Sequence, residues 1–188
     1  IGVLQVINAQ NEEGKIVPFS DEDAKMMVHF ASMATMALER AQMTRTLILR
    51  MIRMAELRDP KETGAHVNRV GSYSVEIYER WAKENNVPAK EIQDNRDVLR
   101  MAAMLHDVGK VAISDQILKK PARLTEEEFD IMKQHTFFGA RLFIDKNSAF
   151  DEAAAEVALS HHEWWNGTGY PGHVDLAATG PGLSFSGQ

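Results

Sequence analysis

A run of nearly forty residues, 21–58, contains neither proline nor glycine, the two residue types that most often end a helix. A continuous helix over this run would be roughly 55 Å long at about 1.5 Å per residue. Ser20 precedes the run and Asp23 lies three residues later, which is the spacing of a helix N-cap with an acidic partner. The sequence therefore predicts one long helix over residues 21–58.

Small and apolar side chains recur along this run at alternating three- and four-residue steps, the spacing of a coiled-coil seam. The seam consists of Phe30, Ala34, Ala37, Ala41, Thr44, Ile48, Met51 and Ala55. We expect a parallel homodimer formed through residues 26–58, in which the helix passes a twist or a register shift along the chain. The methionines of the same run are interpreted as packing residues and not as a cofactor site.

Five of the seven histidines form a pattern that suits metal ions. They are His66, the pair His106-Asp107, His135, and the adjacent pair His161-His162. The chain has no cysteine, which excludes thiolate zinc sites and disulfides. Imidazole and carboxylate ligands suit iron, manganese, zinc or nickel. Adjacent helical residues point about 100° apart, so an adjacent pair serves two neighbouring ions better than one. Paired ions are a common device for phosphoryl displacement.

Three ordered segments resemble the HD-GYP subfamily of the HD phosphohydrolases. They are residues 57–70 (LRDPKETGAHVNRV), 104–110 (MLHDVGK) and 161–171 (HHEWWNGTGYP). The resemblance covers about residues 55–172. It implies an all-helical domain, a centre of two or three divalent metal ions, and hydrolysis of the bacterial messenger cyclic di-GMP to linear pGpG and further to GMP.

The same resemblance implies roles for individual residues. The metal ligands would be Glu62, His66, His106, Asp107, His135, His161 and His162, with iron or manganese as the expected metal. Asp107 would bridge two ions, and Glu62 would bind a third. Lys110 would approach the scissile phosphate, so Asp107 and Lys110 are the expected catalytic residues. The expected substrate-binding residues are Lys110, Gly169, Tyr170 and Pro171.

Two adjacent tryptophans, Trp164 and Trp165, precede the Gly-Tyr-Pro turn. Core packing is the favoured interpretation for them, and stacking on a guanine base is the alternative. Position 164 is often arginine in the subfamily, so Trp164 is a departure from its pattern.

Two alternatives for the function remain open. One is hydrolysis of a different cyclic dinucleotide. The other is a non-catalytic module that binds cyclic di-GMP or docks onto diguanylate cyclase (GGDEF) proteins. The complete set of matched ligands favours the enzyme.

One family ligand, an aspartate in a helix beyond the Gly-Tyr-Pro turn, has no match. Residues 172–188 are rich in Gly, Ala, Ser and Pro and are typical of a loop, and Asp175 lies too close to the turn. We therefore expect an HD-GYP domain that is incomplete at its C-terminus. A polypeptide ending at Gln188 would retain metal weakly and turn over little substrate.

The N-terminal residues suggest a second domain. Residues 2–8 (GVLQVIN) form a β-like run, residues 11–14 (NEEG) a turn, and the capped helix follows. This order resembles the C-terminal end of a GAF sensory domain, which would regulate the enzyme. The expected organisation is a GAF-like fragment with the start of the long helix (1–44), a coiled-coil linker helix (45–58) and the HD-GYP domain (59–188).

The expected fold class is mainly α: an HD-type helical bundle, a long connecting helix and a small α/β remnant of the GAF domain. The predicted bundle helices cover residues 65–85, 96–107, a segment opened by Thr125, 135–143 and 153–161. In the first of these helices the predicted inward face is Val67, Val70, Tyr73, Ile77 and Trp81. In the second it is Val98, Leu99, Ala102 and Leu105.

Composition excludes several other classes. Hydrophobic residues make up 44% of the chain, enough for a core, and the net charge of −6 argues against binding to nucleic-acid polymers. No apolar run approaches the ~20 residues of a membrane span, and no signal peptide is visible. The lack of cysteine is compatible with a reducing cytoplasm, where we expect the protein.

Overall fold

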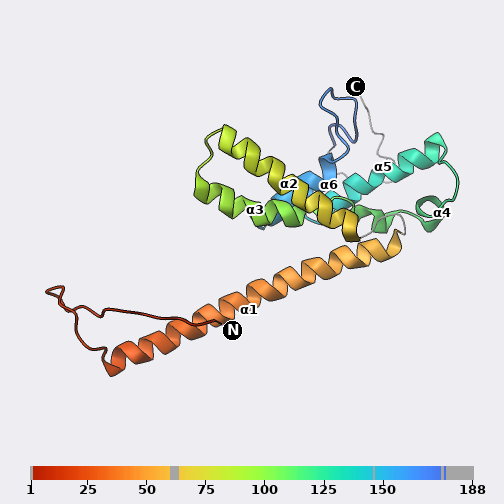
Figure 1. Ribbon diagram of the computed structural model, residues 1–188. Coiled ribbons are helices and arrows are strands. Elements are labelled where there is room, and N and C mark those ends of the chain that lie inside the picture. The colour runs from red at the N-terminus through yellow and green to blue at the C-terminus, as the bar shows by residue number, and fades with distance from the viewer. Residues whose placement is uncertain (1, 60–63, 146, 175, 177–188) are drawn as a thin grey trace. The chain divides into compact units, whose positions relative to one another are not determined.

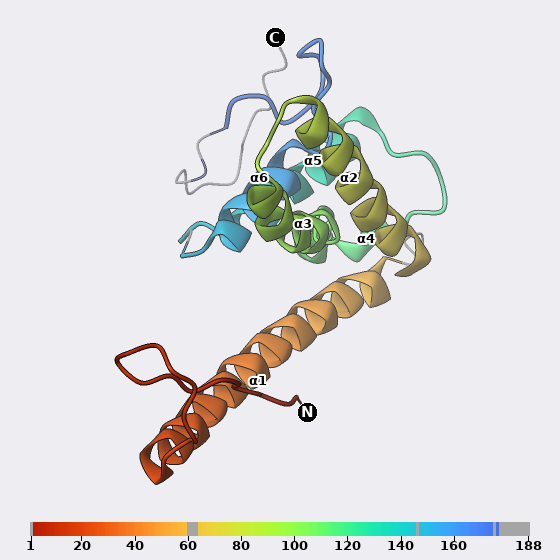
Figure 2. The same ribbon diagram turned by 60° about the vertical axis from the view of Figure 1, so that its left-hand side comes forward.

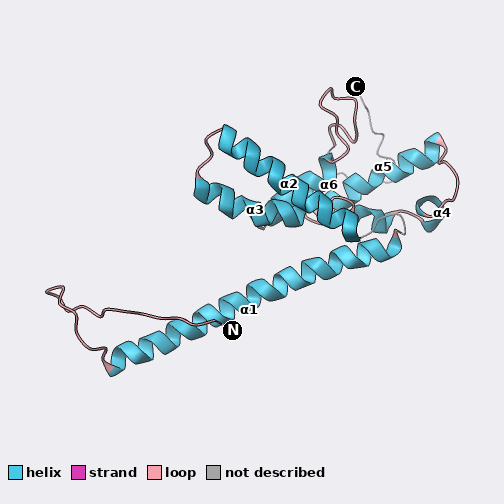
Figure 3. Cartoon of the chain, in the orientation of Figure 1, coloured by secondary structure: helices cyan, strands magenta, loops and turns pink. Residues whose placement is uncertain are grey.

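The computed structural model of the 188-residue chain describes residues 2–59, 64–145, 147–174 and 176. These residues form two compact units, Ile1–Ile48 and Leu49–Gln188. The regular structure in the described residues is helical, with no named strand (Figure 3). The mainly α fold class is therefore confirmed. None of the described helices is long and apolar enough to cross a membrane.

The N-terminal unit begins with irregular chain. Its one pairing among the described residues is an isolated antiparallel bridge between Gln10 and Ile16, closed by the predicted turn, in which Gly14 N–H donates to Asn11 O at 2.8 Å. Residues 2–8 do not form a strand, so this part of the prediction is wrong. Among the described residues this run has no neighbouring strand to supply the backbone hydrogen bonds that stabilise an extended segment. The GAF resemblance stays a prediction.

Helix α1 spans Asp21–Arg58, as the uninterrupted run predicts (Figure 1). At its start, Asp23 N–H donates to Ser20 Oγ (3.1 Å), and the Asp23 carboxylate accepts from Ser20 N–H (2.7 Å). This reciprocal cap confirms the predicted N-terminus. The proposed seam residues Phe30 and Met51 are exposed on the single chain. Pairing through the seam stays a prediction.

The second unit is a helical bundle around one core. Its elements are α2 (Gly64–Glu84), α3 (Ala89–Ala103), the 3-10 helix η1 (Val108–Ala112), α4 (Asp115–Leu118), α5 (Glu126–Arg141) and α6 (Ala149–Ser160). Helix α3 contacts both α2 and α6, and α5 contacts α6 and η1 (Figures 1 and 2). Leu105, Ile113 and Phe137 are fully buried where these elements meet. The contacts converge on the segment between α3 and η1.

Helix α5 begins with a complete capping box. Glu128 N–H donates to Thr125 Oγ1 (3.3 Å), and Thr125 N–H donates to the Glu128 carboxylate (2.8 Å). The predicted start at Thr125 is confirmed. The predicted separate helix over residues 135–143 is instead the second half of α5. His135 therefore lies in the middle of a helix that is fixed at its N-terminus.

The predicted inward face of α2 is partly wrong. Val67 is buried, but the side chains of Tyr73, Ile77 and Trp81 are 60%, 70% and 54% exposed. The buried face instead carries Val67, Gly71, Val75 and Ala82. A Cβ at Gly71 would lie 2.9 Å from Met104 Cγ and 3.1 Å from Arg100 O, so close packing against α3 favours small residues there. Helical periodicity identified an apolar stripe on α2, but most of that stripe is not the face that packs.

Candidate metal centre

Two neighbouring elements place the His-Asp pair. Helix α3 ends at Ala103, earlier than predicted, and His106 and Asp107 lie in the turn before η1. Turn hydrogen bonds hold them, with Leu105 N–H donating to Ala102 O (2.9 Å) and Val108 N–H to Leu105 O (3.0 Å). Because the pair is in a turn, helical side-chain directions do not apply to it.

Gly109 brings this turn against α5. A Cβ at Gly109 would clash with His135 O and with the backbone of Gly139. Only glycine permits this backbone-to-backbone approach. The approach places Asp107 beside His135, although the two residues are far apart in the sequence.

Asp107 is the centre of the resulting cluster. Its Oδ1 lies 3.1 Å from His135 Nε2 and 3.5 Å from His161 Nε2. Its Oδ2 lies 3.0 Å from His106 Nε2 and 3.0 Å from Lys110 Nζ. Asp107, His135, His161 and His162 each offer one ligand atom, and these atoms all lie within 4.8 Å of one another. Four of the seven predicted ligands thus form a group that could hold a metal ion.

Backbone carbonyls fix the tautomers of three histidines. Nδ1 lies 2.9 Å from Ala103 O in His106, 2.7 Å from Met132 O in His135, and 3.0 Å from Ala158 O in His161. A carbonyl oxygen only accepts, so each Nδ1–H donates. In the neutral ring, Nε2 then carries a lone pair that is directed into the cluster.

These lone pairs face other acceptors. His135 Nε2 lies 3.2 Å from His161 Nε2, and both face the Asp107 carboxylate. Acceptors at this distance repel one another unless a cation lies among them. Ring nitrogens held by a backbone carbonyl on the far side are the usual support of metal-binding histidines. The arrangement of donor atoms therefore fits divalent metal ions.

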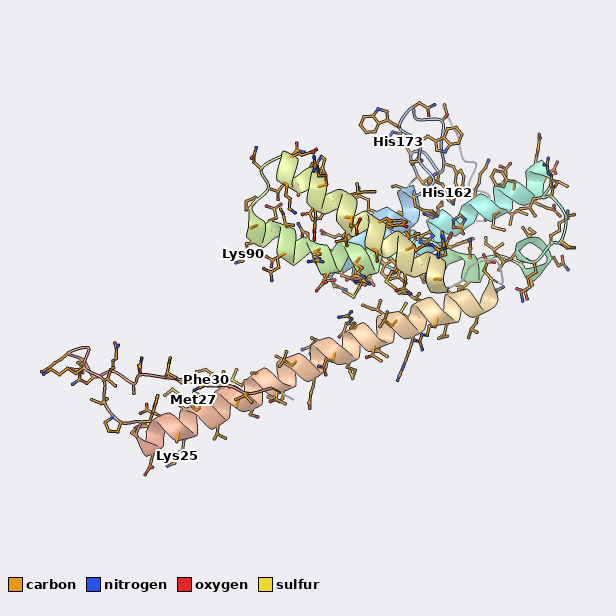
Figure 4. The ribbon with its side chains drawn as sticks, viewed as in Figure 1. Lys25, Met27, Phe30, Lys90, His162 and His173 are labelled. Carbon is orange, nitrogen blue, oxygen red and sulfur yellow. The ribbon has the colours of Figure 1, made fainter. Side chains whose placement is uncertain are left out.

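His162 extends the cluster to the point where the Gly-Tyr-Pro loop begins (Figure 4). Burial, with smaller effects from His161 and His135, lowers the pKa of His162 to about 4. The ring is therefore neutral near pH 7, as a metal ligand must be.

His66 lies beside the four-residue group and not within it. Its ring centroid is 5.8 Å from that of His106, and both line a cavity of about 410 Å³. The other lining residues are Val70, Ser74, Leu99, Ala103, Asp107, Val157, His161 and His162. Glu62 and Asp175 lie outside the described residues.

Comparisons with known proteins agree with this geometry. The HD domain family matches residues 63–183. The chain belongs to the HD domain family. A cyclic di-GMP phosphodiesterase of Thermotoga maritima is 48% identical over 118 residues, which is 63% of this chain and 30% of the relative.

Two relatives come from Vibrio cholerae. A cyclic di-GMP phosphodiesterase is 34% identical over 195 residues, or 98% of this chain and 39% of the relative. A 3'3'-cGAMP-specific phosphodiesterase 2 is 37% identical over 131 residues, or 70% of this chain and 23% of the relative. The chain thus spans between about a quarter and two fifths of the length of these curated relatives.

In this HD domain the Gly-Tyr-Pro turn folds back onto the second histidine pair. Tyr170 N–H donates to His162 O at 3.2 Å, and a Cβ at Gly169 would lie 2.6 Å from Glu163 Cα. The Tyr170-Pro171 peptide bond is cis, and Pro171 is buried. Gly169, Tyr170 and Pro171 therefore shape the loop beside His162, and their contact with substrate stays a prediction.

The tryptophans of the same loop are not in the core. Trp164 is 65% exposed and Trp165 is fully exposed, so the core-packing interpretation is wrong. The loop presents both indole rings to solvent, and stacking on a base stays a prediction.

Sequence reasoning missed Asp59. Its Oδ2 lies 3.1 Å from Lys110 Nζ, and its side chain is buried. A signal was present, because Asp59 directly follows the C-terminus of α1, where the helix dipole disfavours a carboxylate. A nearby cation offsets this unfavourable interaction, so a carboxylate in that position indicates a cationic partner.

Proposed function

We propose that this HD domain is a metal-dependent phosphodiesterase that hydrolyses cyclic di-GMP to linear pGpG. The observation that carries the proposal is the convergence of His106, His135 and His161 Nε2 on the Asp107 carboxylate, with Lys110 Nζ at 3.0 Å from it. The names of the relatives support the substrate class.

The metal-binding residues in this proposal are His106, Asp107, His135, His161 and His162, with His66 and Glu62 as further ligands. Two or three divalent ions, iron or manganese, would occupy the site. Bound ions supply Lewis acidity at phosphoryl oxygens. Imidazole and carboxylate ligands suit both metals.

The chain's own residues then bind and orient the dinucleotide. Lys110 presents a positive charge beside Asp107, where it stabilises the negative charge that develops on the phosphoryl oxygens. Val70, Leu99, Ala103 and Val157 give the cavity an apolar wall next to the ligands. This wall excludes water from one side of the reacting phosphate and leaves the polar side to the cluster.

A second candidate substrate is 3'3'-cGAMP, because one relative is named as specific for it. The two cyclic dinucleotides share their phosphodiester ring and differ in one base. The same cluster would act on either, and the choice would depend on base contacts outside it. Further cleavage of pGpG to GMP belongs to the same proposal.

Control of the activity is also part of the proposal. A GAF-like N-terminal domain and a homodimer through residues 26–58 would regulate the enzyme, and GGDEF proteins would be partners.

Product chromatography tests the activity. A metal-loaded protein with the complete HD-GYP domain is incubated with cyclic di-GMP and, separately, with 3'3'-cGAMP, and pGpG and GMP are quantified. We expect pGpG from cyclic di-GMP and no product from an Asp107→Ala variant. Binding without turnover by the metal-loaded protein would contradict the proposal and identify a binding module.

A further inference from the structure

The end of helix α1 reaches the lysine of the proposed active site. Asp59 directly follows α1, and only 4% of its surface is exposed. Its Oδ2 lies 3.1 Å from Lys110 Nζ, which also lies 3.0 Å from Asp107 Oδ2. The Lys110 ammonium is therefore held between a carboxylate of the metal cluster and a carboxylate from the end of α1.

Arg58, the last residue of α1, binds the same segment. Its guanidinium donates to Ile113 O (2.8 Å) and to Val111 O, and its Nε donates to Asp115 Oδ1 (3.2 Å). Val111 belongs to η1, the short helix that carries Lys110, and Ile113 follows it. Two successive residues thus connect the end of α1 to η1: Arg58 binds the η1 backbone, and Asp59 binds the Lys110 side chain.

Burial makes the contact between Asp59 and Lys110 energetically important. A buried carboxylate costs several kcal/mol unless a cation or hydrogen bonds compensate it. The lysine stem has four rotatable bonds, and its ammonium is mobile unless it is held. Asp59 supplies a second carboxylate at the Lys110 ammonium, in addition to that of Asp107. Without it, the ammonium would lose one of the two carboxylates that hold it, the other being Asp107.

We propose that Asp59 is a positioning residue, which holds the Lys110 ammonium where it meets the phosphate of the cyclic dinucleotide. This inference rests on the proposed phosphodiesterase function. Arg58 binds the backbone of η1 and of Ile113, and Asp59 binds the Lys110 side chain. The position of the α1 end therefore sets the position of the ammonium. A displacement of that helix end is thereby transmitted to the active-site lysine through two side chains.

Two double-mutant cycles test the proposal on the metal-loaded protein. In the first, kcat and KM are measured for Asp59→Asn, Lys110→Gln and the double variant. We expect Asp59→Asn to lower kcat at least about tenfold with KM within about twofold, and to have little further effect in the Lys110→Gln background. Asp94→Asn removes an exposed carboxylate of α3 and should leave kcat unchanged.

The second cycle measures melting temperature and needs no activity. Each single variant removes the interaction between Asp59 and Lys110, so each should melt earlier. The double variant should lose less than the sum of the two shifts.

The outcomes separate this inference from the proposed function. No turnover by the unmodified protein would refute the phosphodiesterase activity, while the melting cycle would still report on the pair. Turnover by Asp59→Asn equal to that of the unmodified protein would overturn the positioning role. An equal loss in the Lys110→Gln background would also overturn it, because Asp59 would then act independently of the lysine. If Asp59→Asn does not fold, Arg58→Lys should lower kcat with KM kept, and an unchanged kcat would overturn the inference.

Discussion

The ring of Tyr170 stacks on the ring of His162, with centroids 4.5 Å apart and planes 21° from parallel. Phe129 of α5 meets the Tyr170 ring edge-on at 6.1 Å. Lys133 Nζ lies 4.9 Å from the Phe129 ring centroid and 5.9 Å from that of Tyr170. The tyrosine of the Gly-Tyr-Pro turn is thus packed between α5 and a candidate metal ligand. This contact restricts the orientation of the His162 ring.

Loss of the Tyr170 ring should weaken metal binding. Tyr170→Leu removes the stacked surface and frees the His162 ring to rotate. Replacing a residue that supports a metal ligand typically lowers metal affinity tenfold or more, so we expect a loss of about tenfold. Tyr170→Phe keeps the ring and should bind metal as the unmodified protein does. Chelator competition measures the affinity. Trp165→Leu, in the same loop but fully exposed, is the matched control. Equal affinities for Tyr170→Leu and the control would contradict the bracing role.

Metal content tests the cluster itself. Elemental analysis of a protein with the complete HD-GYP domain, purified without oxygen, should give at least two transition-metal ions per chain. His135→Ala should lower this number, because His135 Nε2 lies close to both Asp107 and His161. Glu62→Ala should lose one ion and keep the fold. His173→Ala changes an exposed histidine outside the group and should change nothing. Less than one ion per chain in the unmodified protein would refute the assignment.

The features predicted best from the sequence are those determined by local rules. The absence of proline and glycine fixed the bounds of α1, and the Ser20 and Thr125 caps marked two helix starts. The grouping of Asp107, His135, His161 and His162 followed from the motif resemblance. Spacing alone would not have joined His135 to His161, because α5 and α6 come together only through tertiary packing.

The features that were predicted wrongly or not at all depend on tertiary packing. Which stripe of α2 is buried depends on the close approach of α3 at Gly71, and no periodicity carries that information. The β-like run at residues 2–8 has strand propensity, but the described residues contain no strand with which it could pair. The Asp59–Lys110 contact joins two motif segments that are far apart in the sequence, so the motifs alone do not predict it.

Acid should destabilise the start of α5 through Glu128. Its pKa is held below the usual value by the Lys120 ammonium, 2.6 Å from Oε2, and by Thr125 N–H. A lowered pKa means that the ionised form stabilises the fold above the unfolded pKa of about 4.3, and that this contribution is lost as pH falls through the folded pKa. Glu128→Gln should therefore melt earlier than the unmodified protein at pH 7.

At a pH below the folded pKa of Glu128, this difference should disappear. Melting curves recorded from neutral to acid pH check it. Glu126→Gln removes a neighbouring first-turn charge that is not part of the capping box, and serves as the control. A constant gap between Glu128→Gln and the unmodified protein across this range would contradict the assigned pair.

The last prediction concerns dimer formation through the coiled-coil seam of α1. Phe30 and Met51 are seam positions that are 52% and 41% exposed on the single chain, so a partner helix would cover apolar surface there. Replacing both with Asp would bury unpaired carboxylates in a dimer but would leave them hydrated in a monomer. We expect the double variant to sediment as a monomer at concentrations where the unmodified protein is a dimer. Thr46→Asp, on the opposite face of α1, should not change the mass. A dimer that survives the double substitution would show that the seam is placed wrongly.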